Sequence, residues 1–263
     1  MMTLRSPTLG LSAIAMAIGF NLPYANLVAI YDYPDILRRP AAEALQRFTQ
    51  GGVPLILTWH AFAWAALLLV PLSIGLALTP ANRATSDRLA IAAAITGALS
   101  GVAQAIGLWR WVFVIPGLAS RHATGDAATQ AAAEGMFDIL NTWGGVAIGE
   151  HLGQWLLVFF VLALSALHWR QGLRLTAVIG GATALGLGIG TTEGLAIALG
   201  RDGDLFSFFT IGGFLGLSHR HSLPRLQGRK TARRQAGRGA GRAAKWWGPW
   251  ARAGLPGGNG RAW

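Results

Sequence analysis

Five long apolar stretches constrain the fold of this 263-residue chain more than any other feature. Each is longer than the ~20 residues that a helix needs to cross a ~30 Å hydrocarbon core. Backbone polar groups in lipid must be bonded within their own element, so each stretch is predicted to be a helix. The stretches are residues 8–30, 53–79, 89–118, 139–168 and 175–200. A closed barrel would need alternating polar and apolar side chains, and these stretches lack that alternation.

A sixth apolar stretch, residues 205–217, is shorter than the others. A helix of this length extends about 20 Å, which is too short to span the core comfortably. Charged residues are 13% of the chain, against about 25% in soluble domains, and apolar residues are 52%. We therefore expect an all-α, polytopic transmembrane helix bundle of six helices over residues 1–217, with the sixth helix truncated or shortened.

The net charge of +11 belongs to the end of the chain. Residues 1–217 contain 11 Arg and all 11 acidic residues, so this part is neutral. Residues 218–263 are basic, rich in Gly, Arg and Trp, and poor in aliphatic side chains, which predicts a disordered tail. Either the tail is genuine, or the reading frame has shifted inside the sixth stretch. The shortness of that stretch favours the shift.

The possible partners of the chain follow from this distribution. The lipid bilayer is the expected partner of residues 1–217. A genuine tail would contact anionic lipid head groups. Nucleic-acid binding is not expected, because no helix-turn-helix, zinc or RNA-binding-sheet signature accompanies the basic residues.

The Arg residues of the short loops indicate the orientation of the bundle. They place the N-terminus in the cytoplasm, together with the loops between the second and third stretches and between the fourth and fifth. The loop predicted over residues 121–138 has one Arg and three acidic residues, which is typical of the opposite side. The first loop is the exception, since it carries Arg38, Arg39 and Arg47 among three acidic residues.

The first loop, residues 31–52, carries a second pattern. Ala41, Leu45 and Phe48 recur at helical spacing after Pro40, a residue suited to the first turn of a helix. This pattern predicts a short helix on the outer membrane surface. A plain loop is the alternative.

Polar side chains inside the stretches form the candidate site, because burying charge in a bilayer is costly. With a rise of 1.5 Å per residue, the ionisable groups of four different helices lie about 10–16 Å below the outer face. This convergence predicts one ligand-binding or buried polar cluster. Its members are Arg110, Glu150, His151, Glu193, His60 and Gln154.

Arg110 cannot lose its charge, so it needs an anionic partner or water. Glu150 or Glu193 is expected to be that partner. The other carboxylate would then be able to take up and release a proton, with His60 or His151 as a relay. Alternatively, the cluster is a buried ion pair that fixes the helix register, with no ligand.

The spacing of the His residues does not predict a metal or cofactor site. No His-x-x-His, Glu-x-x-His or His-Glu-x-x-His pattern occurs. No Ser/His/Asp arrangement has the spacing of a nucleophile elbow, so the sequence presents no catalytic motif. Small residues at every fourth position (Ala93, Gly97, Gly101 and Ala105) instead predict close helix packing.

Three segments, residues 33–40, 107–118 and 144–154, resemble a bacterial multi-spanning membrane family catalogued as domain-of-unknown-function family 4386. The resemblance covers residues from about 5 to 215 and includes Arg110, Glu150 and His151. It implies a six-helix integral protein of the bacterial inner membrane and no particular reaction. The chain departs from the family pattern after about Gly216.

Three functions are compatible with these patterns. The first is binding or transport of a small molecule through an outward-facing polar cluster. The second is a membrane-embedded enzyme that uses the same groups for acid/base chemistry. The third is a structural or regulatory membrane subunit in which these groups only hold the bundle together.

Overall fold

The computed structural model describes residues 7–199, apart from the side chains of residues 7–10, 13, 193, 194, 197 and 198. All regular structure in this part is helical, which confirms the all-α prediction. The elements are α1 (Pro7–Tyr31), the 3₁₀ turn η1 (Asp35–Arg38), α2 (Ala41–Leu67), α3 (Leu69–Ala77), α4 (Pro80–Phe113), α5 (Ile115–Thr124), α6 (Ala127–Leu140), the π-helix η2 (Asn141–Leu152), α7 (Gly153–Arg170) and α8 (Arg174–Ala198). The predicted sixth helix and basic tail lie outside the described residues.

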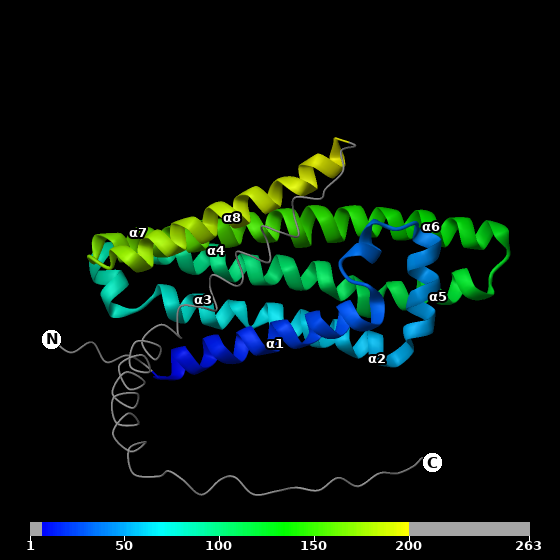
Figure 1. Cartoon of the computed structure of the whole chain (residues 1–263), viewed down its shortest axis with the longest axis horizontal. Helices are drawn as coiled ribbons and strands as arrows, with labels where there is room; N and C mark the ends of the chain where they lie inside the picture. The colour runs from blue at the N-terminus through cyan, green and yellow to red at the C-terminus, as the bar shows by residue number, and fades with distance from the viewer. Residues whose placement is uncertain (1–6, 200–263) are drawn as a thin grey trace, which may run out of the picture. The chain divides into compact units, whose positions relative to one another are not determined.

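Five helical segments in the described part are long and apolar enough to cross a membrane. They cover Ile14–Tyr31, Ala41–Ala77, Pro80–Thr124, Ala127–Arg170 and Arg174–Thr192. Each contains most of one predicted apolar stretch, so the five predicted helices are confirmed. Successive segments run in opposite directions, as Figure 1 shows for the bundle. The protein is a multi-pass helical membrane protein.

The prediction of a loop over residues 121–138 is wrong, because most of this region belongs to a helical hairpin formed by α5 and α6. Asp126 caps α6 by accepting a hydrogen bond from the Thr129 backbone N–H at 2.9 Å. Phe137 on α6 is buried in one core with Leu118 on α5. The prediction failed because the hairpin is amphipathic and not apolar throughout, so a search for apolar stretches passes over it.

Residues 41–51 form the first part of α2. The backbone breaks at Gly52, whose φ of +54° favours glycine, and α2 then continues in a new direction. Figure 1 shows this first part crossing the other helices at a steep angle beside α5 and α6. Leu45 and Phe48 are buried against α5 and α6. The apolar side of this segment therefore faces protein, and its position at the membrane surface remains a prediction.

Helix α4 is the centre of the bundle and packs against α2, α3, α7 and η2. The small residues of α4 allow these neighbours to approach its backbone closely. A Cβ atom on Gly101 would lie 2.9 Å from the backbone oxygen of Ala66, which is too close for any side chain. The predicted close packing at the four small residues of this helix is confirmed, since all four are buried.

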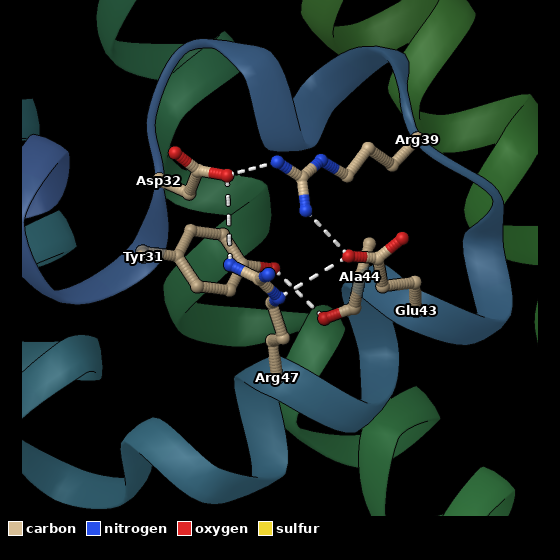
Figure 2. Close-up of polar contacts among 6 residues, drawn as sticks. All are labelled: Tyr31, Asp32, Arg39, Glu43, Ala44 and Arg47. Atoms are coloured by element: carbon tan, nitrogen blue, oxygen red, sulfur yellow. Dashed lines mark hydrogen bonds and ion pairs between the residues drawn. The ribbon is translucent and has the colours of Figure 1, made fainter.

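A ring of four charged side chains holds the α1–α2 connection, and we call it the loop clasp (Figure 2). Its members are Asp32, Arg39, Glu43 and Arg47, with each Arg paired to both acids. Glu43 accepts from Arg39 at 2.6 Å and lies 3.3 Å from Arg47. The Tyr31 hydroxyl also joins the two sides of this connection by donating to the Ala44 backbone oxygen at 2.9 Å. The clasp fixes both ends of the segment that carries η1.

Candidate functional site

Arg110 lies near the end of α4, on the side of the bundle that carries η1 and the α5–α6 hairpin; we call this side the Arg110 end. Its side chain is buried, with 8% of its surface exposed. One terminal nitrogen donates to the Gly107 backbone oxygen, and the other donates to Asn141 Oδ1 at 3.1 Å. A guanidinium group has five N–H donors. The Nε donor is buried without a hydrogen-bond partner among the described residues.

The π-helix η2 builds the wall opposite Arg110. π-helices are rare, usually span a single turn and often occur at functional sites, whereas η2 runs for 12 residues. Its wide turns place Asn141, Gly145 and Glu150 on the side that faces α4. Asn141 also donates to the Leu37 backbone oxygen at 3.0 Å, so it connects Arg110 with η1.

Glycines in η2 make the room that Arg110 occupies. A Cβ atom on Gly145 would overlap the terminal nitrogen of the guanidinium. A Cβ atom on Gly107 would lie 2.7 Å from the Cα of Gly149, so the backbones of α4 and η2 are in direct contact there. Larger side chains at these glycines would push η2 away from α4 or displace the guanidinium.

Glu150 does not pair with Arg110. Its carboxylate lies 3.2 Å from Arg38 of η1, and both side chains are partly exposed. Of the two carboxylates expected as the partner of Arg110, Glu150 is therefore ruled out at ion-pair distance. The other candidate partner, Glu193, belongs to α8, but its side chain lies outside the described residues. Among the described residues, Arg110 has no carboxylate at ion-pair distance.

A pocket of about 80 Å³ opens between α2, α4, η1 and η2. A buried water needs roughly 10–15 Å³, so the pocket has room for several waters or one small organic group. Two of its lining residues, Arg110 and Glu150, carry formal charges. Polar and aromatic side chains complete the wall: Gln104, Gln154, Tyr33, Trp59, Phe62 and Trp111.

Two stacked indoles support one side of the pocket. The rings of Trp59 and Trp111 lie 4.8 Å apart with an interplanar angle of 8°, and both side chains are fully buried. Neither indole N–H has a hydrogen-bond partner among the described residues. Burial and the negative charge of Glu150 raise the pKa of Tyr33. The Tyr33 hydroxyl therefore stays protonated at neutral pH and is able to donate a hydrogen bond.

Three other predicted site residues lie in three different places. Gln154 lines the pocket, and its oxygen accepts from the Thr191 hydroxyl at 3.4 Å. His151 faces α8, where its ring nitrogen lies 3.3 Å from the Thr191 backbone oxygen. His60 does not line this pocket. It accepts a hydrogen bond from Trp64 at 2.9 Å on the side of α2 that carries the exposed Trp64 ring.

Sequence reasoning missed Asn141 and the aromatic side of the pocket. Asn141 lies near the start of an apolar stretch, where Asn is unremarkable. The stacking of Trp59 on Trp111 joins two different helices, and no sequence spacing reports such a pair. For the contact of η2 with α4, the available signal is the density of Gly in residues 144–149, which marks a close approach of two helix backbones.

The opposite side of the bundle also buries a strongly polar side chain, Asn82 of α4; we call this side the Asn82 end. The Asn82 amide donates to the backbone oxygens of Leu76 and Ala77 at 2.9 and 3.1 Å. Its oxygen accepts from Gln171 at 2.8 Å. These bonds join the α3–α4 turn to the α7–α8 turn, and the amide group uses both of its donors and its acceptor.

The model of a family described as Domain of unknown function (DUF4386) matches residues 8–216. The chain belongs to this family. No curated protein and no solved structure matches the chain. This match confirms the resemblance that the sequence suggested. All lining residues of the pocket fall within the matched region of this DUF4386 chain. The family description assigns no activity to Arg110 or to its neighbours.

Proposed function

We propose that this DUF4386 protein is a membrane-embedded binding protein that holds a small organic anion against Arg110. One observation carries the proposal. Arg110 is a buried cation on the wall of a pocket, and the described residues supply acceptors for two of its five donors and no ion-paired carboxylate. An uncompensated cation in a poor dielectric attracts an anion strongly.

The geometry also supports a ligand better than a purely structural role. A structural ion pair is expected to fill the space around both partners, because packing in protein interiors leaves few voids. Around Arg110 a pocket of about 80 Å³ remains instead, although Gly145 and Gly149 let η2 pack closely on the guanidinium and on α4. Planar guanidinium groups bind carboxylates and phosphates through two parallel N–H donors, and the aromatic wall of the pocket favours an organic carboxylate over an inorganic anion.

Thermal unfolding of the purified protein in detergent tests the proposal. Benzoate and acetate are compared with benzamide and acetamide, their neutral counterparts. A ligand at ten times its Kd adds about 1.4 kcal/mol to stability. We expect the carboxylates to raise Tm and the amides to leave it unchanged. Benzoate also partitions into micelles, so the rise in Tm is compared between Arg110→Met, which should lose it, and a matched control that removes a different positive charge. The control is Arg121→Met on the exposed side of α5, which is expected to keep the full rise in Tm. Equal effects of benzoate and benzamide would contradict the proposal.

We propose in addition that the protein resides in the bacterial inner membrane with a cytoplasmic N-terminus and the Arg110 end outside. The loop arginines that disagree with this orientation are in ion pairs: Arg38 with Glu150, and Arg39 and Arg47 with the loop clasp. The chain has no Cys, so a single added thiol reports the sidedness cleanly. Ala128→Cys in the α5–α6 hairpin is expected to react with an impermeant thiol reagent in intact cells, and Ala84→Cys near the α3–α4 turn is not. The reverse labelling would invert the proposed orientation.

A further inference from the structure

The pocket presents one positive and one negative side chain, and only the positive one is without a charged partner among the described residues. Glu150 lines the same pocket as Arg110, but its carboxylate lies 3.2 Å from Arg38. A ligand therefore meets one free positive charge at Arg110 and one negative charge that is already paired. A single negative charge on the ligand balances this arrangement.

We propose that the ligand is a singly charged carboxylate carried on a flat apolar body, and that Glu150 is the residue that excludes a second negative charge. The inference rests on the proposed function above and names the ligand class of the same pocket. A second carboxylate on the ligand would lie in the same small pocket as Glu150. Like charges that share a desolvated site repel strongly, which lowers the affinity for dianions.

Arg38 is already paired with Glu150, so it offers no ready site for a second carboxylate of the ligand. It belongs to η1, whose position is fixed by the loop clasp on both sides and by the bond from Asn141 to the Leu37 oxygen. Because Arg38 is held beside Glu150, a dianion that recruited Arg38 would have to displace the Glu150 carboxylate. The ion pair thus keeps Arg38 on Glu150 and leaves Glu150 as a barrier to a second negative charge on the ligand.

The apolar part of the ligand follows from the remaining wall. Trp59, Phe62 and Trp111 are buried or nearly buried, and they lie beside Leu37 and Leu108 around the pocket. Aromatic walls favour flat apolar groups that stack or meet ring edges. A bare inorganic anion would gain nothing from this surface, whereas an aromatic or unsaturated carboxylate would cover it.

The test compares benzoate with isophthalate, which adds one carboxylate to the same ring, at pH 8 by titration calorimetry in nanodiscs. For the wild type we expect the Kd of isophthalate to exceed that of benzoate by about tenfold or more. Glu150→Gln is expected to reduce this ratio about tenfold. The matched control is Glu134→Gln on α6, where the carboxylate pairs with His122 away from the pocket, and it is expected to leave the ratio unchanged. Acetate is expected to bind more weakly than benzoate.

Arg38→Gln supplies a second, opposite test if Glu150→Gln fails to fold. It removes the cation beside Glu150 and should raise the ratio. An unchanged ratio in whichever of the two variants folds overturns the inference, as does isophthalate that binds the wild type as tightly as benzoate. Acetate that equals benzoate overturns the apolar part. If benzoate binds Arg110→Met with the same affinity as it binds the wild type, the proposed function itself is overturned. The absence of any binding to the wild type overturns both the proposed function and this inference.

Discussion

The two ends of the bundle each bury one strongly polar side chain of α4, and the two side chains differ in how fully they are hydrogen-bonded. At the Asn82 end, the amide uses all of its donors and its acceptor on Leu76, Ala77 and Gln171. At the Arg110 end, the described residues supply acceptors for two of the five guanidinium donors, and a pocket opens beside the guanidinium. Buried polar groups are normally fully bonded, because each unmet donor costs free energy.

This difference separates two reasons for placing a polar group in a membrane bundle. Asn82 joins two helix–helix turns, and its bonds close on the protein itself, as expected of a purely structural residue. Arg110 lies opposite glycines and beside stacked indoles, and the described residues leave part of its hydrogen-bonding capacity unused. The incomplete end is the one that we assign to ligand binding.

The largest expected effect is on binding, from Arg110→Met. Loss of charge-assisted hydrogen bonds costs about 1.5–3 kcal/mol, so the Kd for benzoate should rise about tenfold to a hundredfold. The unfolding free energy in mixed micelles should fall by no more than about 2 kcal/mol, because Gly107 and Asn141 each lose one donor but no ion pair among the described residues is broken. A loss of 3–5 kcal/mol that Glu193→Leu restores would instead show a structural ion pair.

The next effect concerns stability alone, from Asn82→Ala at the Asn82 end. The change leaves Gln171 and two backbone oxygens unpaired in the protein interior, so the unfolding free energy should fall by about 2 kcal/mol. Benzoate affinity should not change. Gln171→Ala removes one bond and should cost about 1 kcal/mol, and the double variant should cost less than the sum. A change in benzoate affinity in these variants would show that the two ends are coupled.

A smaller effect is expected from Gly145→Ala, which tests the space at the Arg110 end. The added methyl group overlaps the guanidinium and should displace it from the pocket. We expect the Kd for benzoate to rise about tenfold, a shift of about 1.4 kcal/mol. Gly135→Ala on α6 is the matched control, because a Cβ atom there meets nothing within 4 Å. If both variants bind benzoate like the wild type, the guanidinium does not contact the ligand.

The smallest effect is the pH dependence of the exposed part of the Arg110 end. The hydrogen bonds from Thr129 lower the pKa of Asp126, so this cap stabilises α6 when the carboxylate is ionised. The contribution is present above about pH 4 and is lost as the pH falls through the lowered pKa. Asp126→Asn should lose this acid dependence in thermal unfolding and keep benzoate binding. An equal acid dependence in the wild type and in Asp126→Asn would show that the Asp126 cap does not cause it.

Much of the fold could be predicted from sequence, because a bilayer permits few choices. Each apolar stretch long enough to span had to be a helix, and the small residues of α4 predicted the close helix packing that the structure has. The α5–α6 hairpin escaped prediction because its helices are amphipathic. The positions of the sixth stretch and the tail lie outside the described residues.

The candidate site was predictable in part. The cost of buried charge selected Arg110 and Glu150, which share the pocket, but depth along a helix does not say which side a residue faces. His60 was placed with them by depth and lies elsewhere, beside Trp64. The pairing of Glu150 with Arg38 depends on how the α1–α2 connection folds back over the bundle. That path is decided by tertiary contacts such as the loop clasp, and no local pattern encodes it.

The most direct test of anion binding at Arg110 is the number of benzoate molecules bound per chain. Equilibrium dialysis of radiolabelled benzoate against protein in nanodiscs, with empty nanodiscs as the blank, measures this number. We predict one saturable site per chain in the wild type and none in Arg110→Met over the same concentration range. Saturable binding of equal stoichiometry and affinity in both proteins, or no saturable binding in the wild type, would contradict the assignment of Arg110 as the ligand-binding cation.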